Sequence, residues 1–200
     1  MIGTPKAVIF DLDGTLTEPL LDFDAMRAEI GLPPGPILEQ LAHADAATRA
    51  RADQILRRHE REAIAKATLA DGCVELLAAL EAHGIPAAIL TRNVREVVDT
   101  FVTTFGFRFA AVYTREDGPH KPSPAGVHAL CGRMCAAPAE TLVVGDYKFD
   151  IIAGRDAGCP TVLVTSTHAP TAAELPDWGP PDLVVASLRE LISLLPSPRG

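Results

Sequence analysis

Two aspartates stand one residue apart near the start of the sequence, at the end of an apolar run. Asp11 and Asp13 follow Val8–Phe10, and Gly14 and Thr15 come directly behind them. Two carboxylates this close repel each other and resist removal from water. They fit either an exposed turn or a site that needs concentrated negative charge, such as a centre for metal-assisted phosphoryl transfer. The rest of the sequence has to distinguish these two interpretations.

Further polar side chains follow later apolar runs of the chain. They are Thr91, Lys121, Asp146 and, one helical turn beyond it, Asp150. Each alone has an ordinary explanation, as a helix cap, a solvated lysine or the first turn of a helix. Because the carboxyl ends of parallel strands meet at one edge of a sheet, we expect all of them to gather there with the first two aspartates.

The expected cluster combines acids, a hydroxyl group and one ammonium group. A single lysine cannot balance four carboxylates, and hard oxygen ligands favour Mg²⁺, which commonly bridges to a phosphate. The metal, Lys121, Thr91 and backbone amides beside Gly14 would together cradle a phosphoryl group. One aspartate could then attack phosphorus, while the other protonates the leaving oxygen and later activates water.

Six short apolar runs are predicted to be the strands that position these residues. They do not alternate with polar residues, which is typical of strands buried on both faces of a parallel sheet. Helical patterns lie between them, including Val74–His83, a helix beginning at Ser123-Pro124, and Leu191–Leu195 behind a capping box at Ser187–Glu190. The pattern predicts an α/β fold with a doubly wound, Rossmann-like parallel sheet. The predicted strands are Ala7–Phe10, Ala87–Leu90, Ala110–Tyr113, Thr141–Val144, Thr161–Val164 and Leu183–Val185.

Residues 18–70 interrupt this alternation, because they contain no strand pattern. Three helices are expected there, over Asp22–Ile30, Ile37–Ala44 and Ala46–Ala70. We interpret residues 18–70 as a small all-helical cap domain over the carboxyl edge of the sheet. Residues 1–17 and 71–200 would then form the catalytic core, with Thr165–Pro181 as a long surface loop.

The composition restricts the class of partner. The chain has 200 residues, is 48% hydrophobic and carries a net charge of −8, which disfavours binding to nucleic acid or to an anionic membrane. A small phosphorylated metabolite is the expected partner, and the protein is expected to be cytoplasmic and either a monomer or a homodimer. The four cysteines show no metal-binding spacing, and Cys131 and Cys135 are interpreted as buried free thiols instead of a redox pair.

Several stretches resemble the haloacid dehalogenase superfamily, particularly its phosphoglycolate-phosphatase-like branch with a helical cap after the first strand. They are Asp11–Thr15, Leu90-Thr91, Lys121-Pro122, Gly145-Asp146 and Asp150–Gly154, continued by Asp156–Gly158. The resemblance implies that Asp11 is the nucleophile and Asp13 the general acid and base. It implies phosphate binding by Leu12, Asp13, Thr91, Arg92 and Lys121. It also implies Mg²⁺ bound by Asp11, the backbone carbonyl of Asp13 and Asp146, with Asp150 in support.

The implied reaction is Mg²⁺-dependent hydrolysis of a small phosphomonoester through an aspartyl-phosphate. An acid at Asp13 is typical of the superfamily's phosphatases and is lacking in its dehalogenases. Two positions depart from the usual family pattern: Tyr147 replaces a small hydroxyl residue, and Arg92 replaces an asparagine, with Asn93 one position later. We expect Asn93 and Tyr147 to shape substrate specificity, together with Arg58 and His59 of the basic cap helix. Most basic residues of that helix are interpreted as a solvated face with charge pairs to Glu60 and Glu62.

Two alternatives stay open at this point. A phosphomutase of the same superfamily would share the chemistry but return the phosphoryl group to its substrate, although Thr15 and the following Leu-Thr-Glu favour the phosphatase form. A receiver-like signalling switch also gathers acids, a hydroxyl group, a lysine and Mg²⁺ at a sheet edge, without turnover. Such switches usually place adjacent acids after the first strand, whereas Leu12 separates Asp11 from Asp13 here.

Overall fold

A single six-stranded parallel sheet forms the centre of the molecule, with the strand order β3-β2-β1-β4-β5-β6. The computed structural model describes residues 2–165 and 178–196. The strands are β1 (Ala7–Phe10), β2 (Ala87–Leu90), β3 (Ala111–Tyr113), β4 (Thr141–Gly145), β5 (Thr161–Val164) and β6 (Leu183–Val185). Every predicted strand is present, with one-residue differences at one end of β3 and of β4. The predicted doubly wound α/β fold is therefore confirmed.

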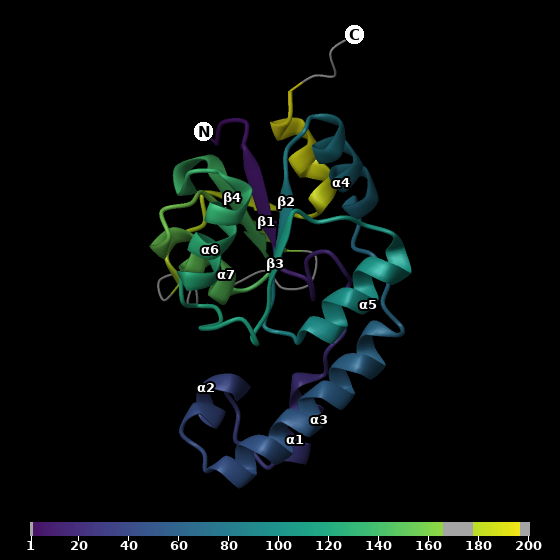
Figure 1. Cartoon of the computed structure of the whole chain (residues 1–200), viewed down its shortest axis with the longest axis vertical. Coiled ribbons are helices and arrows are strands. Elements are labelled where there is room, and N and C mark those ends of the chain that lie inside the picture. Colours follow the sequence, from purple (N-terminus) through teal and green to yellow (C-terminus); the bar gives the residue numbers. More distant parts are fainter. Residues whose placement is uncertain (1, 166–177, 197–200) are drawn as a thin grey trace.

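Helices cover both faces of this sheet (Figure 1). On one face lie α4 (Cys73–Ala82), α5 (Arg95–Phe105) and the 3₁₀ helix η2 (Leu188–Leu194), and on the other lie α6 (Ala125–Met134) and α7 (Lys148–Asp156). The short 3₁₀ helix η1 (Pro138–Glu140) directly precedes β4. Val8 and Phe10 of β1 pack into the first core and Ile9 into the second, because successive side chains of a strand point to opposite faces. Burial on both faces accounts for the unbroken apolar runs.

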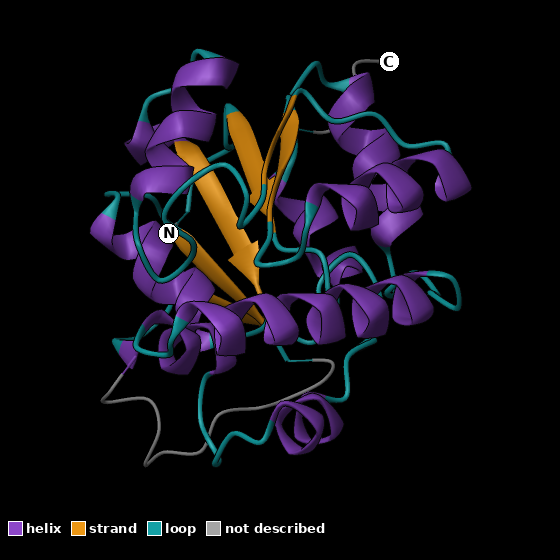
Figure 2. Ribbon diagram, turned by 60° about the horizontal axis from the view of Figure 1, so that its bottom comes forward, coloured by secondary structure: helices purple, strands orange, loops and turns teal. Residues whose placement is uncertain are grey.

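Three further helices lie beyond the carboxyl ends of the strands: α1 (Phe23–Ile30), α2 (Ile37–Ala42) and α3 (Ala46–Ile64). Aspartates begin two of them, since Asp22 accepts a hydrogen bond from the Ala25 amide and Asp45 from the Thr48 amide. The three helices share an apolar cluster of their own. Figure 2 shows the long helix α3 crossing below the strand ends, where a cap was expected. The division into two domains stays a prediction.

The last of these helices is shorter than predicted, because α3 ends at Ile64 and not at Ala70. Beyond it, Thr17 and Leu69 form an antiparallel bridge. The Ala70 amide donates to the Leu16 carbonyl at 3.1 Å, an ordinary distance for a backbone hydrogen bond. Pairing between the two connecting segments satisfies backbone groups that a continued helix would have paired internally. The chain therefore enters and leaves the helical region through adjacent segments.

Other local predictions also need correction. The second helix of this region ends at Ala42, not Ala44. The predicted helix at 191–195 is the 3₁₀ helix η2, where Ser187 makes no side-chain cap and Glu190 accepts from the Ala186 amide. Cys135 is exposed, with φ 53° at the end of α6, so the prediction of a buried thiol was wrong there. Most of the predicted loop 165–181 lies outside the described residues. Among the helices that are described, none is long and apolar enough to span a membrane.

Candidate active site

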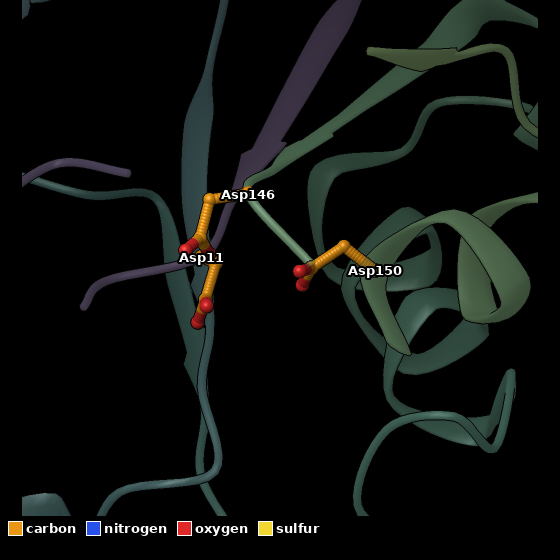
Figure 3. Close-up of side chains that lie close together, drawn as sticks. All are labelled: Asp11, Asp146 and Asp150. Atoms are coloured by element: carbon orange, nitrogen blue, oxygen red, sulfur yellow. The ribbon is translucent and has the colours of Figure 1, made fainter. Parts of the chain in front are cut away.

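The predicted acids meet where the strand order of the sheet reverses. β1 and β4 are neighbours, and Asp11 and Asp146 follow directly behind them. The Asp11 amide donates to the Val144 carbonyl at 2.9 Å, which holds the two strand ends together. Asp150 reaches the same place from the first turn of α7, and Figure 3 shows its carboxylate directed toward the other two. This is the point at which open parallel sheets bind their ligands.

The three carboxylates form a compact group of oxygen ligands. One oxygen from each of Asp11, Asp146 and Asp150 lies within 4.8 Å of the others. Burial, together with the charges of the neighbouring aspartates, raises the pKa of Asp146 to about 8. Burial likewise raises the pKa of Asp150 to about 6. A divalent cation would stabilise the charged carboxylates against burial and mutual repulsion, and the oxygen-only donor set fits the predicted Mg²⁺.

Lys121 is the cation within this group. Its side chain is 2% exposed, and Nζ lies 2.7 Å from Asp11 Oδ1 and 2.5 Å from Asp150 Oδ1. Burial acts to lower the pKa of Lys121, but the charges of Asp11 and Asp150 outweigh it and raise the pKa above its ordinary value. The ammonium group therefore stays charged and holds the Asp11 carboxylate in position. The phosphate-binding role predicted for Lys121 stays a prediction.

Asp13 occupies a different environment from Asp11. Its Oδ1 accepts a hydrogen bond from the Leu20 amide at 2.7 Å, at the start of the connection to α1. Burial raises the pKa of Asp13 to about 7, and the charge of Asp11 adds to this effect. A carboxyl group with a pKa in this range can both give and take a proton near neutrality, which suits the predicted general acid and base.

Two glycines make room for these carboxylates. Gly14 has φ +81°, and a Cβ atom there would lie 2.3 Å from Asp146 Oδ2. A Cβ atom on Gly145 would lie 2.1 Å from Asp150 Cγ. Thr15, which the sequence analysis gave no separate role, is fully buried and donates from Oγ1 to Asp146 Oδ1 at 3.5 Å. The one indication of this contact in the sequence was the position of its hydroxyl group, directly behind Gly14.

Thr91 lies at the end of β2, one strand away from Asp11. It is buried, and its amide donates to the Tyr113 carbonyl at 2.9 Å. Its Oγ1 accepts from the Asn93 amide at 3.1 Å, so buried Asn93 fixes the hydroxyl group. The sheet thus brings Thr91 to the edge that carries the acids, although its contact with phosphate stays a prediction.

Arg92 connects the catalytic edge with the helical region. Its Nη2 donates to Glu39 Oε2 of α2 at 2.8 Å, and its guanidinium carbon lies 4.3 Å from the centre of the Phe149 ring. Glu39 and Phe149 were not singled out from the sequence, because a single glutamate or phenylalanine in a helix carries no local signal of such a contact. The phosphate-binding role predicted for Arg92 stays a prediction.

The remaining specificity candidates differ in their surroundings. Arg58 and His59 of α3 both pair with Glu29 of α1, so these contacts lie within the helical region. Tyr147 is 40% exposed directly behind Asp146, and its ring contacts those of Phe149 and Trp178 edge-on. Tyr147 therefore lies beside the acids, whereas Arg58 and His59 contact α1.

A buried ion pair fixes α3 on the core. Glu60 is 4% exposed and pairs with Arg115, which follows β3. Arg115 Nη1 also donates to the Arg92 carbonyl at 3.1 Å. Burial raises the pKa of Glu60 although the charge of Arg115 opposes the shift. Glu60 was expected to pair with basic residues on a solvated face of this helix, which is wrong because it is buried and its partner comes from a distant segment.

The chain is similar to known proteins in both sequence and fold. A family model described as "Haloacid dehalogenase-like hydrolase" matches residues 19–164. The chain is 30% identical to an N-acetylmuramic acid 6-phosphate phosphatase of Pseudomonas aeruginosa, over 95% of this chain and 94% of that protein. It is 32% identical to a phosphoglycolate phosphatase of Xanthomonas campestris, over 79% and 82%. The crystal structure of a hydrolase from Pseudomonas syringae shares the fold, with a TM-score of 0.79 at 20% identity, covering 94% of this chain and 96% of that one.

Proposed function

The chain belongs to the haloacid dehalogenase-like hydrolase family, and from this premise we propose that it hydrolyses small phosphomonoesters with Mg²⁺ through an aspartyl-phosphate. One observation carries the proposal. The Asp11 carboxylate is held by buried Lys121 at 2.7 Å and lies in a group of three acids at the switch point of the sheet. Two relatives that match most of this chain are named as phosphatases, which supports the reaction class.

In the first half of the reaction, an Asp11 carboxylate oxygen attacks phosphorus. The new O–P bond forms as the ester P–O bond breaks, and Asp13 gives its proton to the leaving alkoxide. Lys121 and Thr91 hold the phosphoryl oxygens while charge develops on them. In the second half, Asp13 takes a proton from water, which attacks phosphorus and releases inorganic phosphate and the free Asp11 carboxylate.

Mg²⁺ would be held by Asp11, Asp146, Asp150 and the backbone carbonyl of Asp13. Bound there, it supplies positive charge that lets the acids and a phosphate share one site. Without it, three neighbouring carboxylates and one lysine leave excess negative charge where an anionic substrate must bind. The donor set therefore agrees with the role that we propose for the metal.

The proposal assigns residues 18–70 to a cap that closes over the phosphate site and contacts the alcohol portion of the ester. A small phosphorylated metabolite fits it better than nucleic acid or a membrane surface, because the net charge of the chain is −8. The cytoplasmic location and the monomeric or homodimeric state stay predictions.

The proposal is tested by turnover of p-nitrophenyl phosphate with Mg²⁺. Asp11→Asn should lose at least about 1,000-fold in kcat, since an amide cannot form the acyl-phosphate. Asp99→Asn, which changes an exposed aspartate of α5 in the same way, is the matched control and should keep its activity. Near-normal turnover by the Asp11 variant would refute the assignment of the nucleophile.

The products separate the alternatives. A phosphatase releases one inorganic phosphate per ester consumed, whereas a phosphomutase yields an isomeric ester. A receiver-like switch would be labelled stoichiometrically on an aspartate and would not turn over.

A further inference from the structure

The ion pair between Arg92 and Glu39 joins three segments that surround the candidate active site. Arg92 follows Thr91 in the loop behind β2, and Glu39 belongs to α2 of the helical region. The guanidinium group also lies over the ring of Phe149, the residue before Asp150. Two of these segments thus adjoin the proposed phosphate-binding and metal-binding residues, and the third belongs to the proposed cap.

Each member of this pair carries a second polar atom that the ion pair does not use. Within the described part of the chain, Arg92 Nη1 and Glu39 Oε1 are both buried and have no hydrogen-bond partner. Buried polar atoms are nearly always paired with protein, water or ligand, so two such atoms on one ion pair require an explanation. Together they offer the N–H groups of one guanidinium nitrogen and one carboxylate oxygen as an acceptor. A hydroxyl group satisfies both, because it accepts through its oxygen and donates through its hydrogen.

The charge of the pair restricts the ligand further. Glu39 neutralises Arg92, so the guanidinium group is not a free anchor for a second anion. A substrate carboxylate placed against the pair would meet the buried Oε1 of the Glu39 carboxylate as a like charge, which disfavours binding. A neutral hydroxyl group meets no such repulsion. The pair thus matches an alcohol better than an acid.

We propose that the Arg92–Glu39 pair binds a hydroxyl group on the alcohol portion of the substrate, and that the enzyme accordingly prefers polyol or sugar phosphates to phosphate esters that carry a carboxylate. This inference rests on the proposed phosphatase activity and specifies its substrate class. Glu39 and Arg92 are then specificity-determining residues contributed by opposite sides of the site.

Three small esters test the inference on the wild-type protein with Mg²⁺. Glycerol 3-phosphate carries free hydroxyl groups, 2-phosphoglycolate carries a carboxylate, and ethyl phosphate carries neither. We expect kcat/KM for glycerol 3-phosphate to exceed that for each of the other two by about tenfold or more, the effect of one well-placed hydrogen bond to a charged group. A higher kcat/KM for 2-phosphoglycolate than for glycerol 3-phosphate overturns the inference.

Variants of Glu39 test the role of the pair itself. Glu39→Gln removes the negative charge, so the preference for glycerol 3-phosphate over 2-phosphoglycolate should fall by about fivefold or more. Glu39→Asp keeps the charge and should keep most of that preference. Glu62→Gln, an equivalent change at an exposed glutamate of α3, should leave the ratio unchanged. An unchanged ratio in Glu39→Gln overturns the inference.

The design separates this inference from the proposed function. If p-nitrophenyl phosphate and all three esters resist hydrolysis, the phosphatase proposal itself fails and the inference fails with it. If the esters are hydrolysed without the expected order, only the assignment of Arg92 and Glu39 is overturned. The wild-type comparison decides this even where a variant does not fold.

Discussion

Replacing Arg115 by methionine should destabilise the protein strongly, because it leaves a buried carboxylate without its partner. The Arg115 side chain is 9% exposed and that of Glu60 is 4% exposed, so solvent does little to screen the pair. Once the guanidinium group is removed, the hydrogen bond that Glu60 retains in the described structure is the one from the Val94 amide at 3.5 Å. Methionine fills a similar volume, so the loss is mainly electrostatic.

The expected magnitude follows from the burial of the pair. Removing one partner of a buried ion pair typically costs about 3–5 kcal/mol in the free energy of unfolding. The bond from Arg115 Nη1 to the Arg92 carbonyl is lost as well, which places this variant within that range and not below it. The double variant Glu60→Leu/Arg115→Met removes both charges and should recover at least about 2 kcal/mol of the loss.

The same loss should depend on pH in a defined direction. Burial already raises the pKa of Glu60 above its ordinary value of 4.5, and removing Arg115 takes away the main opposing effect. A group whose folded pKa is raised contributes stability fully below its unfolded pKa, and this stability is lost as the pH rises through the folded pKa. The destabilisation by Arg115→Met should therefore be larger at about pH 7 than at about pH 5.

Urea unfolding followed by circular dichroism measures these differences for the wild type, both single variants and the double variant. Arg61→Met changes an exposed residue of α3, the helix that carries Glu60, and is the control. It should change the unfolding free energy by less than about 0.5 kcal/mol. A loss below about 1 kcal/mol for Arg115→Met, or a loss that grows on acidification, would refute the reasoning.

Three further variants or treatments address the site directly. Asp13→Asn can still accept the Leu20 amide but cannot carry a proton, so kcat for p-nitrophenyl phosphate should fall by about 10²–10⁴-fold; a smaller loss would exclude it as the proton carrier. Treatment with EDTA should abolish turnover and added Mg²⁺ should restore it, whereas activity that survives complete chelation would contradict the metal proposal. Gly14→Ala should reduce both activity and the urea midpoint, because its Cβ would lie 2.3 Å from Asp146 Oδ2 at φ +81°. Gly84→Ala, at φ +67° with open space around it, bears the backbone strain alone and should leave turnover unchanged.

The sequence predicted the sheet and the position of the acids well, for a simple physical reason. Strands buried on both faces must be apolar throughout, so their ends are visible as the points where polar residues begin. Asp11, Thr91 and Asp146 were located in this way, and the strand order places them on neighbouring strands. The family match and the relatives named as phosphatases support the reaction class that these residues indicated.

Contacts between distant segments were not predictable in the same way. Glu39 and Glu60 lie among many charges of surface helices, and nothing nearby in the sequence distinguishes their partners, Arg92 and Arg115. The prediction that the last helix continues to Ala70 was wrong for a related reason, since local helix preference gave way to the pairing of Leu69 with the distant Thr17. Local patterns describe elements, whereas these features arise only after the elements pack.

The bridge between Thr17 and Leu69 has a consequence for the architecture of the enzyme. The Glu18 amide donates to the Thr68 carbonyl at 3.0 Å, so the two ends of the intervening helices lie side by side. An inserted segment whose ends are adjacent can change in length or content without altering the path of the chain around it. The helices α1, α2 and α3 are thus free to diverge, while the sheet edge that carries Asp11 keeps its structure.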